Sequence, residues 1–392
     1  MIVYTGLDSL ALNKFEKIRN KRIALLCNQA SITRDLKHAV DVFYTAHLEN
    51  TIELNCLIGP QHGLWGHTQD NMIEWQGYRD CRTGIPVYSL YSENREPTTE
   101  MLSGVEALVV DLQDVGAKYY TFIWSLFLCF KVCRKLDIEI VVLDRPNPIG
   151  GEQIEGPFVN ENFRSFVGLE SLGIRHAMTI GEIATYFKET FFPESQLTVV
   201  KMEGWERKMY FENTGLPWAM PSPNIPTSQS CLVYPGMCLL EATNLSEGRG
   251  TTCPFEMFGA EWMNGWELVN RLKQHNLPGV VFRPLEFQPT FHKHAGEICG
   301  GCFIHVTDPL IFKPFLTTIA ILRETVKMYP EKFAWKQPPY EYEYEKMPFD
   351  ILAGNDWLRK MIEELQPLNT MEERWVEESN TFKKIRQQFL LY

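Results

Sequence analysis

The sequence predicts an α/β protein: a parallel sheet covered by helices, followed by a second, smaller α/β domain. The first half of the chain alternates short apolar runs with segments of helical periodicity, which is the order of elements in βαβ units. The runs are rich in Val, Ile and Leu, as are strands buried on both faces. A length of 392 residues and a hydrophobic content of 45% suit about two globular domains. We expect these domains at 1–235 and 236–392.

Five strands and three helices are expected in the first domain. The strands are short apolar runs that end in polar or turn-forming residues, and they lie at 21–29, 52–60, 106–116, 138–148 and 197–205. The helices show apolar residues at helical spacing, and they lie at 36–49, 120–136 and 179–192. The most apolar helix, 120–136, is too short to span a bilayer and contains Lys131, so we expect it to be buried in the protein.

The second part begins with a long segment of unusual composition. Residues 213–260 are rich in Pro, Gly, Ser, Thr and Asn, which predicts little regular structure, yet their aromatic residues argue against disorder. Segments of this kind are commonly functional. Beyond it we expect helices at 266–276 and 316–329, strands at 279–287 and 302–308, and a charged helical tract from 340 onward.

Charge and composition exclude several classes of function. A net charge of −11 and a pI of about 5.4 fit poorly with a nucleic-acid partner, because nucleic acid favours clustered Lys and Arg. No run of residues is long and apolar enough for a membrane span, and the N-terminus lacks the pattern of a secretory signal. We therefore expect no membrane partner and a cytoplasmic location, while the oligomeric state is left open.

Cysteine and histidine form no recognisable metal motif. The ten Cys are scattered through strand and helix patterns, as reduced, buried thiols are. The pair Cys299 and Cys302 has no second pair at zinc spacing, so a structural turn is expected there. His292 and His294 lack a third ligand at a useful spacing and are also expected to be structural. The sequence predicts no metal and no other cofactor.

Polar side chains follow four of the predicted strands where the strands end. They are Asn28 and Gln29, Gln61 and His62, Asp111 with Gln113 and Asp114, and Asp144 with Arg145. Ligands of open parallel sheets bind outside these ends, so the groups indicate a site, although a residue such as Asp144 also suits a turn cap. The sheet is Rossmann-like in its order of elements, but no GxGxxG or GxxxxGK[ST] motif follows a strand, which argues against a nucleotide.

Two loops are expected to border one cleft. Residues 59–75 read GPQHGLWGHTQDNMIEW, which is too polar for a core and too aromatic for a plain linker. Residues 241–250 carry Glu241, Glu247 and Arg249 beside glycines that let the backbone approach a ligand closely. The alternative for this second loop is a solvated turn whose arginine pairs with a glutamate.

Nine motifs in this order resemble those of the NamZ-type exo-β-N-acetylmuramidases, and they cover nearly the whole chain. They are TGLDSL (5–10), CNQAS (27–31), GPQHGLWG (59–66), TGIPVYSLY (83–91), DLQDVGAKYYTF (111–122), LDRPNP (143–148), PSPNIPT (221–227), ATNLSEGRGTTCPFEMFGA (242–260) and FDILAGND (349–356). The resemblance implies a Rossmann-like N-terminal domain, a smaller C-terminal α/β domain and an active cleft between them. It also implies removal of N-acetylmuramic acid (MurNAc) from the non-reducing end of peptidoglycan-derived glycans, without a nucleotide or a metal.

One motif departs from the family pattern. Members commonly carry Pro-Glu-His-Gly where this chain has Pro60-Gln61-His62-Gly63, and the resemblance makes that glutamate a leading candidate for the catalytic acid. Gln61 has no proton to give. Three explanations stay open: another carboxylate acts, the substrate differs, or the protein binds glycan without cleaving it.

Glycoside hydrolysis needs a protonated acid at the leaving oxygen, and either a second carboxylate or the substrate's own acetamide at the anomeric carbon. Asp70 and Asp111 are among the acids near the expected cleft, and the preferred catalytic candidates are Glu247, Glu74, Asp114 and Glu241. Arg249 suits the lactyl carboxylate of MurNAc, since Arg binds carboxylates through paired N–H groups. The expected substrate-binding residues are Gln61, His62, Asn28, Arg249, Tyr119, Asn224 and Trp65, with Trp75 as a further ring for a sugar face.

The expected function is therefore a glycosidase that releases MurNAc from peptidoglycan fragments during cytoplasmic recycling, with a small carbohydrate as its partner. The alternatives are a catalytically silent glycan-binding protein, a hydrolase of a different glycoside, and a nucleotide-using enzyme on the same sheet, because a shared fold does not fix function. Tight sugar binding without turnover would identify the first alternative. Stabilisation by NAD(P) would identify the last.

Overall fold

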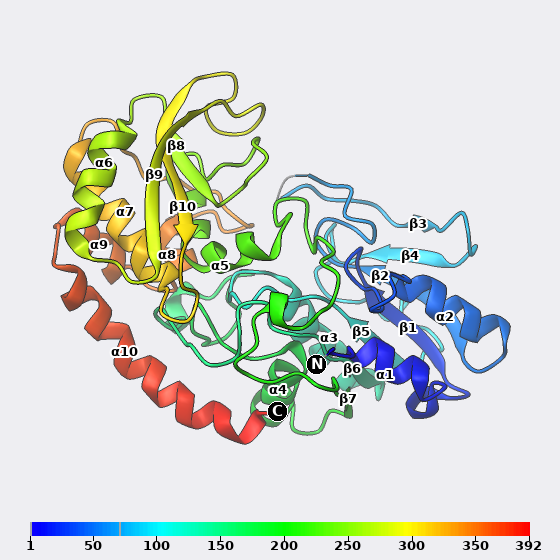
Figure 1. The fold of residues 1–392 in the computed structure, drawn as a ribbon. Helices are drawn as coiled ribbons and strands as arrows, with labels where there is room; N and C mark the ends of the chain where they lie inside the picture. Colours follow the sequence, from blue (N-terminus) through cyan, green and yellow to red (C-terminus); the bar gives the residue numbers. More distant parts are fainter. Residues whose placement is uncertain (1, 70–71) are drawn as a thin grey trace.

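The computed structural model describes residues 2–69 and 72–392, and this part contains two β-sheets (Figure 1). The larger sheet has seven strands in the order β3-β4-β2-β1-β5-β6-β7. Its neighbouring pairs are parallel except for β3 with β4. The strands are β1 (Arg22–Cys27), β2 (Glu53–Gly59), β3 (Tyr78–Arg79), β4 (Pro86–Ser89), β5 (Ala107–Asp111), β6 (Glu139–Leu143) and β7 (Leu197–Val200).

Alternation along the strands divides the core of this sheet into two layers. In β1, Ile23 and Leu25 belong to the core formed with α1 and α2, while Ala24 and Leu26 belong to the core formed with α3 and α4. The helices are α1 (Gly6–Leu12), α2 (Ala39–Leu48), α3 (Phe122–Leu136) and α4 (Ile180–Phe191). Because helices cover both faces, the central strands are apolar throughout. The five strands and three helices expected here are confirmed, whereas α1, β3 and β4 lie outside the expectation.

The second sheet is antiparallel, in the order β8-β10-β9. Its strands are β8 (Met257–Ala260), β9 (Val280–Phe287) and β10 (Cys299–Val306), and the helices beside it are α6 (Gly265–Leu272) and α7 (Pro314–Met328). The helices and strands expected in this region are confirmed. The turn expected at Cys299 and Cys302 is wrong, because both cysteines lie within β10 and are buried there as free thiols.

The segment 213–260 is more regular than its composition predicts. It contains α5 (Ser228–Met237), the 3₁₀ helix η4 (Cys238–Ala242) and β8. Thr227 caps α5 by accepting from the N–H of Ser230. Gly236 lets α5 approach α7, since a Cβ there would overlap the Pro314 carbonyl. Packing thus overrides the helix-breaking Pro235, and the predicted domain boundary after residue 235 falls inside this helix.

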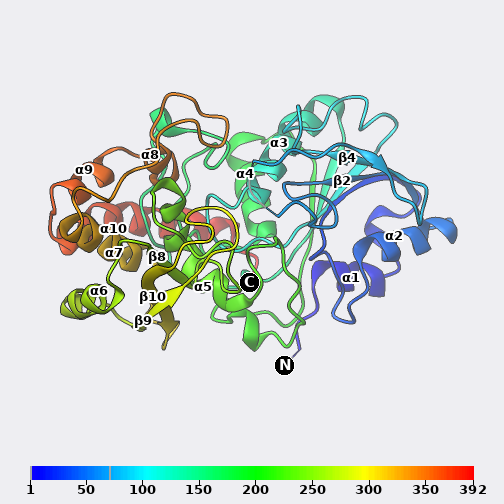
Figure 2. The same cartoon turned by 90° about the horizontal axis from the view of Figure 1, so that it is seen from above.

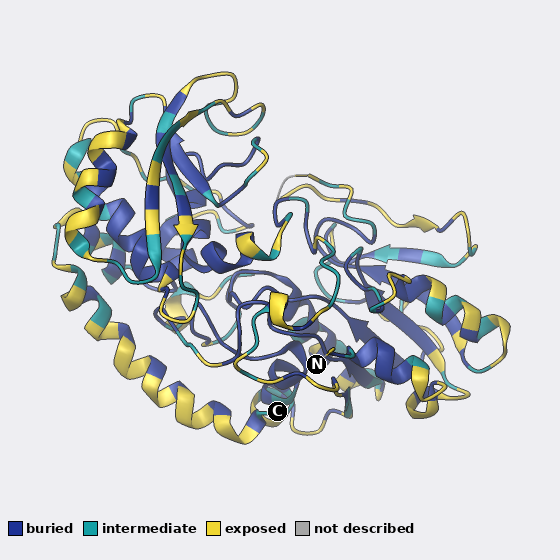
Figure 3. Ribbon diagram, in the orientation of Figure 1, coloured by how far each residue is buried: buried dark blue, intermediate teal, exposed yellow. Residues whose placement is uncertain are grey.

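The C-terminal tract confirms the expected helices and returns to the first sheet. It forms α8 (Pro348–Ala353), α9 (Trp357–Glu363) and α10 (Leu368–Ile385). Helix α10 runs along the lower edge of the molecule with an exposed outer face (Figure 3), and in the view from above it passes behind the elements around α7 (Figure 2). The final residue, Tyr392, donates its hydroxyl to Asp144 Oδ2 at 2.7 Å, directly after β6. In the described part of the chain, no helix is long and apolar enough to cross a membrane.

Candidate active site

A polar cavity lies where the loops after β2 and β5 meet the α5–β8 segment and the loop before α8. The described residues that line it are Gln61, His62, Tyr119, Tyr120, Thr121, Phe122, Val167, Ser222, Asn224, Ile225, Tyr234, Cys238, Glu241, Arg249, Phe255, Tyr340 and Glu341. Both parts of the chain contribute, at the carboxyl ends of the parallel strands, where open sheets bind their ligands.

The loop after β2 contributes two polar side chains whose positions are fixed. Gln61 Oε1 accepts from the Thr121 hydroxyl at 2.6 Å. Since Thr121 lies just before α3, this bond ties the loop to the neighbouring strand–helix connection. His62 adopts a left-handed turn conformation with φ of +70°, and its Nδ1 lies 2.9 Å from the Thr68 carbonyl oxygen. Gln61 therefore offers the cavity an amide, not an acid.

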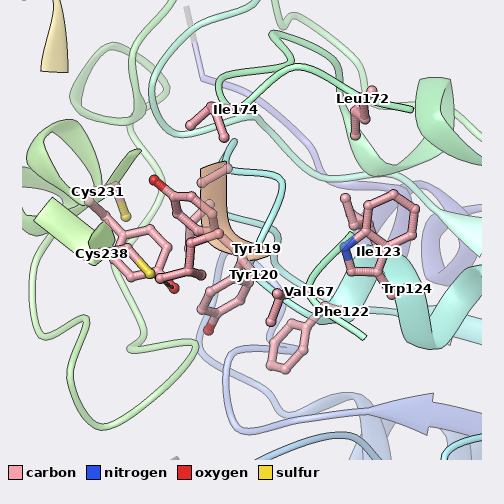
Figure 4. Packing of buried hydrophobic residues seen from close by; sticks show 14 of the residues in the cluster. Tyr119, Tyr120, Phe122, Ile123, Trp124, Val167, Leu172, Ile174, Cys231 and Cys238 are labelled. Carbon is pink, nitrogen blue, oxygen red and sulfur yellow. Dashed lines mark hydrogen bonds between the residues drawn. The ribbon is translucent and has the colours of Figure 1, made fainter. Parts of the chain in front are cut away.

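The interior of the cavity is aromatic. Tyr119 and Tyr120 precede α3 and lie beside Cys238 and Val167 (Figure 4). Both rings meet Tyr234 of α5 edge to face, with centroids 5.7 and 5.9 Å apart. The Tyr119 hydroxyl donates to the Pro235 carbonyl, which fixes the ring. Burial raises the pKa values of Tyr119, Tyr120 and Tyr234, so these phenols stay protonated and uncharged.

A charge cluster contributes Glu241 and Arg249 to another wall of the cavity, and Glu247, His292 and Lys293 lie outside the lining. Arg249 Nη2 lies 2.7 Å from Glu241 Oε1, and Arg249 Nε lies 3.3 Å from Glu247 Oε1. Lys293 Nζ lies 2.9 Å from the second oxygen of Glu247, and His292 Nδ1 lies 3.3 Å from the first. Burial alone would raise the pKa of Glu247, but Lys293, His292 and Arg249 together hold it well below its ordinary value. Glu247 is therefore an ionised anchor for Arg249 and unsuited to donate a proton.

Two glycines explain how the backbone brings this cluster together. Gly248 and Gly250 both have φ of +81°, a conformation that favours glycine. A Cβ on Gly250 would overlap the backbone of Phe291. The 241–250 loop can therefore pack closely against the loop that carries Lys293.

Glu341 is a second lining carboxyl with different neighbours. It lies in the loop before α8, its side chain is buried, and its Oε2 accepts from the Tyr91 hydroxyl at 3.0 Å. Burial raises the pKa of Glu341 to about 7. Sequence patterns do not single it out, because glutamates alternate with tyrosines over 341–345 and only the fold decides which one is buried.

Family models match both parts of this architecture. The N-terminal model of the exo-β-N-acetylmuramidase NamZ matches residues 23–229, and the C-terminal model matches residues 232–392. The chain belongs to the NamZ family. The resemblance carried by the nine motifs is thereby confirmed.

NamZ-family relatives cover the chain from end to end. The peptidoglycan β-N-acetylmuramidase NamZ of Bacillus subtilis (strain 168) is 42% identical over 391 residues, which are 100% of this chain and 91% of the relative. Two crystal structures of DUF1343-family proteins from Bacteroides fragilis are also similar, with TM-scores of 0.89 and 0.78 at 31% and 27% identity. Each match covers 100% of this chain and 99% of the solved chain. The expected α/β fold is confirmed.

Several residues expected in the site of this NamZ-family member lie outside the described cavity lining. Glu74 is exposed, and its Oε1 lies 3.4 Å from Arg95. Asp114 is buried; its Oδ2 accepts from the Gly116 N–H at 2.7 Å and lies 3.1 Å from His176 Nε2. Asp70 lies outside the described residues.

Of the expected sugar-binding residues, some also lie outside the described cavity lining and others lie within it. Asn28 is buried and donates to the Pro221 carbonyl at 2.8 Å. Trp65 packs on the His38 ring at 4.5 Å, and Trp75 is buried beneath the loop with its indole N–H donating to the Pro60 carbonyl. Asn224 does line the cavity, as do Gln61, His62, Tyr119 and Arg249.

Other polar groups of the strand ends and histidine loop have structural partners. Asp111 forms a two-point ion pair with Arg145 at 2.6 and 2.8 Å, and Asp144 accepts from the Gly181 N–H at the start of α4. His294 Nε2 lies 2.8 Å from the Asn244 carbonyl oxygen. Within residues 2–69 and 72–392, no group of three His, Cys, Asp or Glu is arranged to hold a metal ion.

Proposed function

We propose that this NamZ-family chain is a glycoside hydrolase that releases MurNAc from the non-reducing end of peptidoglycan-derived glycans. The observation that carries the proposal is the 42% identity, over the full chain, to the B. subtilis peptidoglycan β-N-acetylmuramidase. That identity favours a hydrolase over a silent glycan-binding protein. The cavity supports the proposal, because it combines carboxyls, amides, an arginine and aromatic rings in one concave site.

The lining residues suggest how MurNAc would be held. Arg249 is the arginine of the described lining, and it remains our choice for the lactyl carboxylate that distinguishes MurNAc from other amino sugars. The amides of Gln61 and Asn224 would donate to sugar hydroxyls or to the acetamide carbonyl. The rings of Tyr119 and Tyr120 would exclude water from the apolar side of the sugar.

The reaction would follow the chemistry of N-acetyl sugars. The acetamide of MurNAc can attack its own anomeric carbon, so the protein then needs one proton donor and one carboxylate to orient the acetamide. Glu241 suits the orienting role, because it lines the cavity and is held by Arg249 and by the Tyr340 hydroxyl at 2.8 Å.

We place this activity in the cytoplasm, in the recycling of wall fragments. The ten cysteines support this location, because all are free thiols, as a reducing compartment allows. Fractionation of the source cells with an antibody to the chain would test the location. Recovery outside the cytoplasmic fraction would contradict it.

Hydrolysis of the disaccharide MurNAc–N-acetylglucosamine by the purified protein tests the activity. We expect release of free MurNAc, which is monitored by chromatography with mass detection. Sugar binding without release would favour the glycan-binding alternative. Release from another glycoside alone would point to a different substrate.

A further inference from the structure

A glycosidase needs a proton at the leaving oxygen, and the described lining of the cavity contains two carboxyl groups, Glu241 and Glu341. Gln61 cannot supply the proton. Glu247 cannot either, because Lys293 and Arg249 lie at ion-pair distance, His292 lies at hydrogen-bond distance, and its lowered pKa keeps it ionised. The choice within the described lining is therefore between Glu241 and Glu341.

Glu241 accepts hydrogen bonds through both of its oxygens. One of its oxygens pairs with Arg249 at 2.7 Å, and the other accepts from the Tyr340 hydroxyl at 2.8 Å. A carboxyl that accepts from a guanidinium and a phenol is held in place as a hydrogen-bond acceptor. It suits orientation of a substrate better than release of a proton.

Glu341 has the opposite surroundings. Its one hydrogen-bonding side chain in the described structure is the phenol of Tyr91. The charged and titratable groups that act on it are Tyr91, Tyr340, Tyr342, Arg95, Glu241 and Arg249. Both arginines have other partners at ion-pair distance: Arg95 pairs with Glu74 and Arg249 pairs with Glu241. The neighbouring Glu241 disfavours a second negative charge in the same cavity.

The backbone holds Glu341 at the junction between the two halves of the cleft. Its φ is +45°, a left-handed conformation rarely used by glutamate. Its N–H donates to Met72 Sδ, 3.3 Å away in the loop that follows β2, whose described residues 60–69 and 72–75 we call the lip loop. The bridge between Tyr340 and Glu343 closes the turn around it. Strain of this kind is commonly retained where a side chain has a function.

We propose that Glu341 is the proton donor of the glycosidase. This inference rests on the proposed function and adds to it the residue that protonates the leaving group. The raised pKa of Glu341, about 7, agrees with the geometry, because it keeps a substantial protonated fraction at neutral pH.

Hydrolysis of a MurNAc glycoside by this acid breaks one C–O bond and forms another. The C1–O bond breaks with its electron pair going to the leaving oxygen, which takes the proton from Glu341 and departs as an alcohol. Water supplies the new oxygen at C1 and loses one proton to solvent. Solvent then reprotonates the Glu341 carboxylate, so each turnover consumes one water molecule.

Glu341→Gln, compared on two substrates, tests the proposal. With MurNAc–N-acetylglucosamine, whose alkoxide is a poor leaving group, kcat should fall by about 10²–10⁴-fold, the usual contribution of a positioned acid. With the 4-nitrophenyl β-glycoside of MurNAc, whose leaving group needs no proton, kcat should fall less than about tenfold. The matched controls are Glu343→Gln and Glu345→Gln, the next glutamates of the same loop, which should retain activity on both substrates.

Three results separate the possibilities. A wild-type rate on the disaccharide in Glu341→Gln would overturn the proposal while leaving the glycosidase intact. Equal losses on both substrates, with MurNAc binding weakened in calorimetry, would also overturn it, since they indicate a structural role. An inactive wild type on both substrates would overturn the glycosidase and the proton donor together. Glu341→Asp adds a second variant: partial recovery relative to Glu341→Gln on the disaccharide is expected.

Discussion

Glu247 and Glu341 are both buried beside one cavity, yet their neighbours give them opposite properties. Glu247 lies among Lys293, His292 and Arg249 and is held ionised, with a pKa well below its ordinary value. Glu341 faces a phenol, and burial raises its pKa to about 7. Burial alone therefore does not decide what a glutamate can do. The difference lies in whether cations are buried with it.

The largest expected effect on stability is that of Glu247→Gln. Removing this charge leaves Lys293 without its buried counter-ion and leaves Arg249 with Glu241 alone, which costs about 3–5 kcal/mol in the free energy of unfolding. Urea denaturation near pH 7 measures it. Glu341→Gln serves as the comparison and should cost about 1 kcal/mol or less, because an uncharged amide replaces a carboxyl that is partly protonated. Equal losses in the two variants would show that the cations do not distinguish the sites.

The pH dependence of stability should differ in sign between the two glutamates. The pKa of Glu247 is lowered on folding, so its contribution is present above the ordinary value of 4.5 and is lost as pH falls below it. The pKa of Glu341 is raised, so its contribution is present below 4.5 and is lost as pH rises through about 7. Unfolding free energies of wild type and each Gln variant, measured from about pH 2 to 8, would show the two opposite differences. If the two Gln variants differed from wild type with the same pH dependence, the opposite pKa shifts of Glu247 and Glu341 would be contradicted.

The pH dependence of kcat/KM should reflect the raised pKa of Glu341. For the disaccharide, kcat/KM should fall about tenfold per pH unit above pH 7, since the deprotonated acid cannot protonate the leaving group. The 4-nitrophenyl glycoside should show a much flatter alkaline limb. A flat profile on the disaccharide would place the proton on a group other than Glu341.

Tyr91→Phe tests the surroundings of Glu341 through a smaller change, a shift in the pH profile of kcat/KM. The Tyr91 hydroxyl donates to Glu341 and thereby lowers its pKa, so its removal should move the alkaline limb of kcat/KM to higher pH. The loss of one buried hydrogen bond should cost about 1 kcal/mol of stability. Tyr91 is a positioning residue, and the pH profile distinguishes this role from simple packing. A limb that moves to lower pH would contradict it.

Much of the fold follows from local sequence patterns, and the exceptions have physical causes. Strands β1 and β5 are buried along nearly their whole length, so their apolar runs are clear in the sequence. Strands β3 and β4 are short and lie at one edge of the sheet, where little burial enforces a pattern. Helix α5 is not evident in the sequence, because it contains Pro235 and Gly236. Only the packing of α5 on α7 explains the glycine.

The site is less predictable, because it depends on which polar groups find partners. Strand ends do locate the cavity, since Gln61 and His62 line it. Asp111, at a neighbouring strand end, instead forms an ion pair with Arg145. Glu341 lies far from these residues in the sequence and comes to the cavity through tertiary packing. No spacing rule connects residues that meet in this way.

The smallest expected effect is that of Glu74→Gln, which tests this difference between a sequence candidate and a structural one. Glu74 belongs to the lip loop, but its side chain is 42% exposed and its contacts are Arg95 at 3.4 Å and the Tyr342 hydroxyl at 3.2 Å. Exposed ion pairs of this kind contribute about 0–1 kcal/mol, so stability should change little and kcat/KM on the disaccharide should stay within about threefold of wild type. Urea denaturation measures the stability, and steady-state kinetics beside Glu341→Gln measures kcat/KM. A loss of a hundredfold or more would mean that the lip closes over bound glycan and brings Glu74 onto the sugar, so that burial in the complex, and not in the unliganded chain, selects the acid.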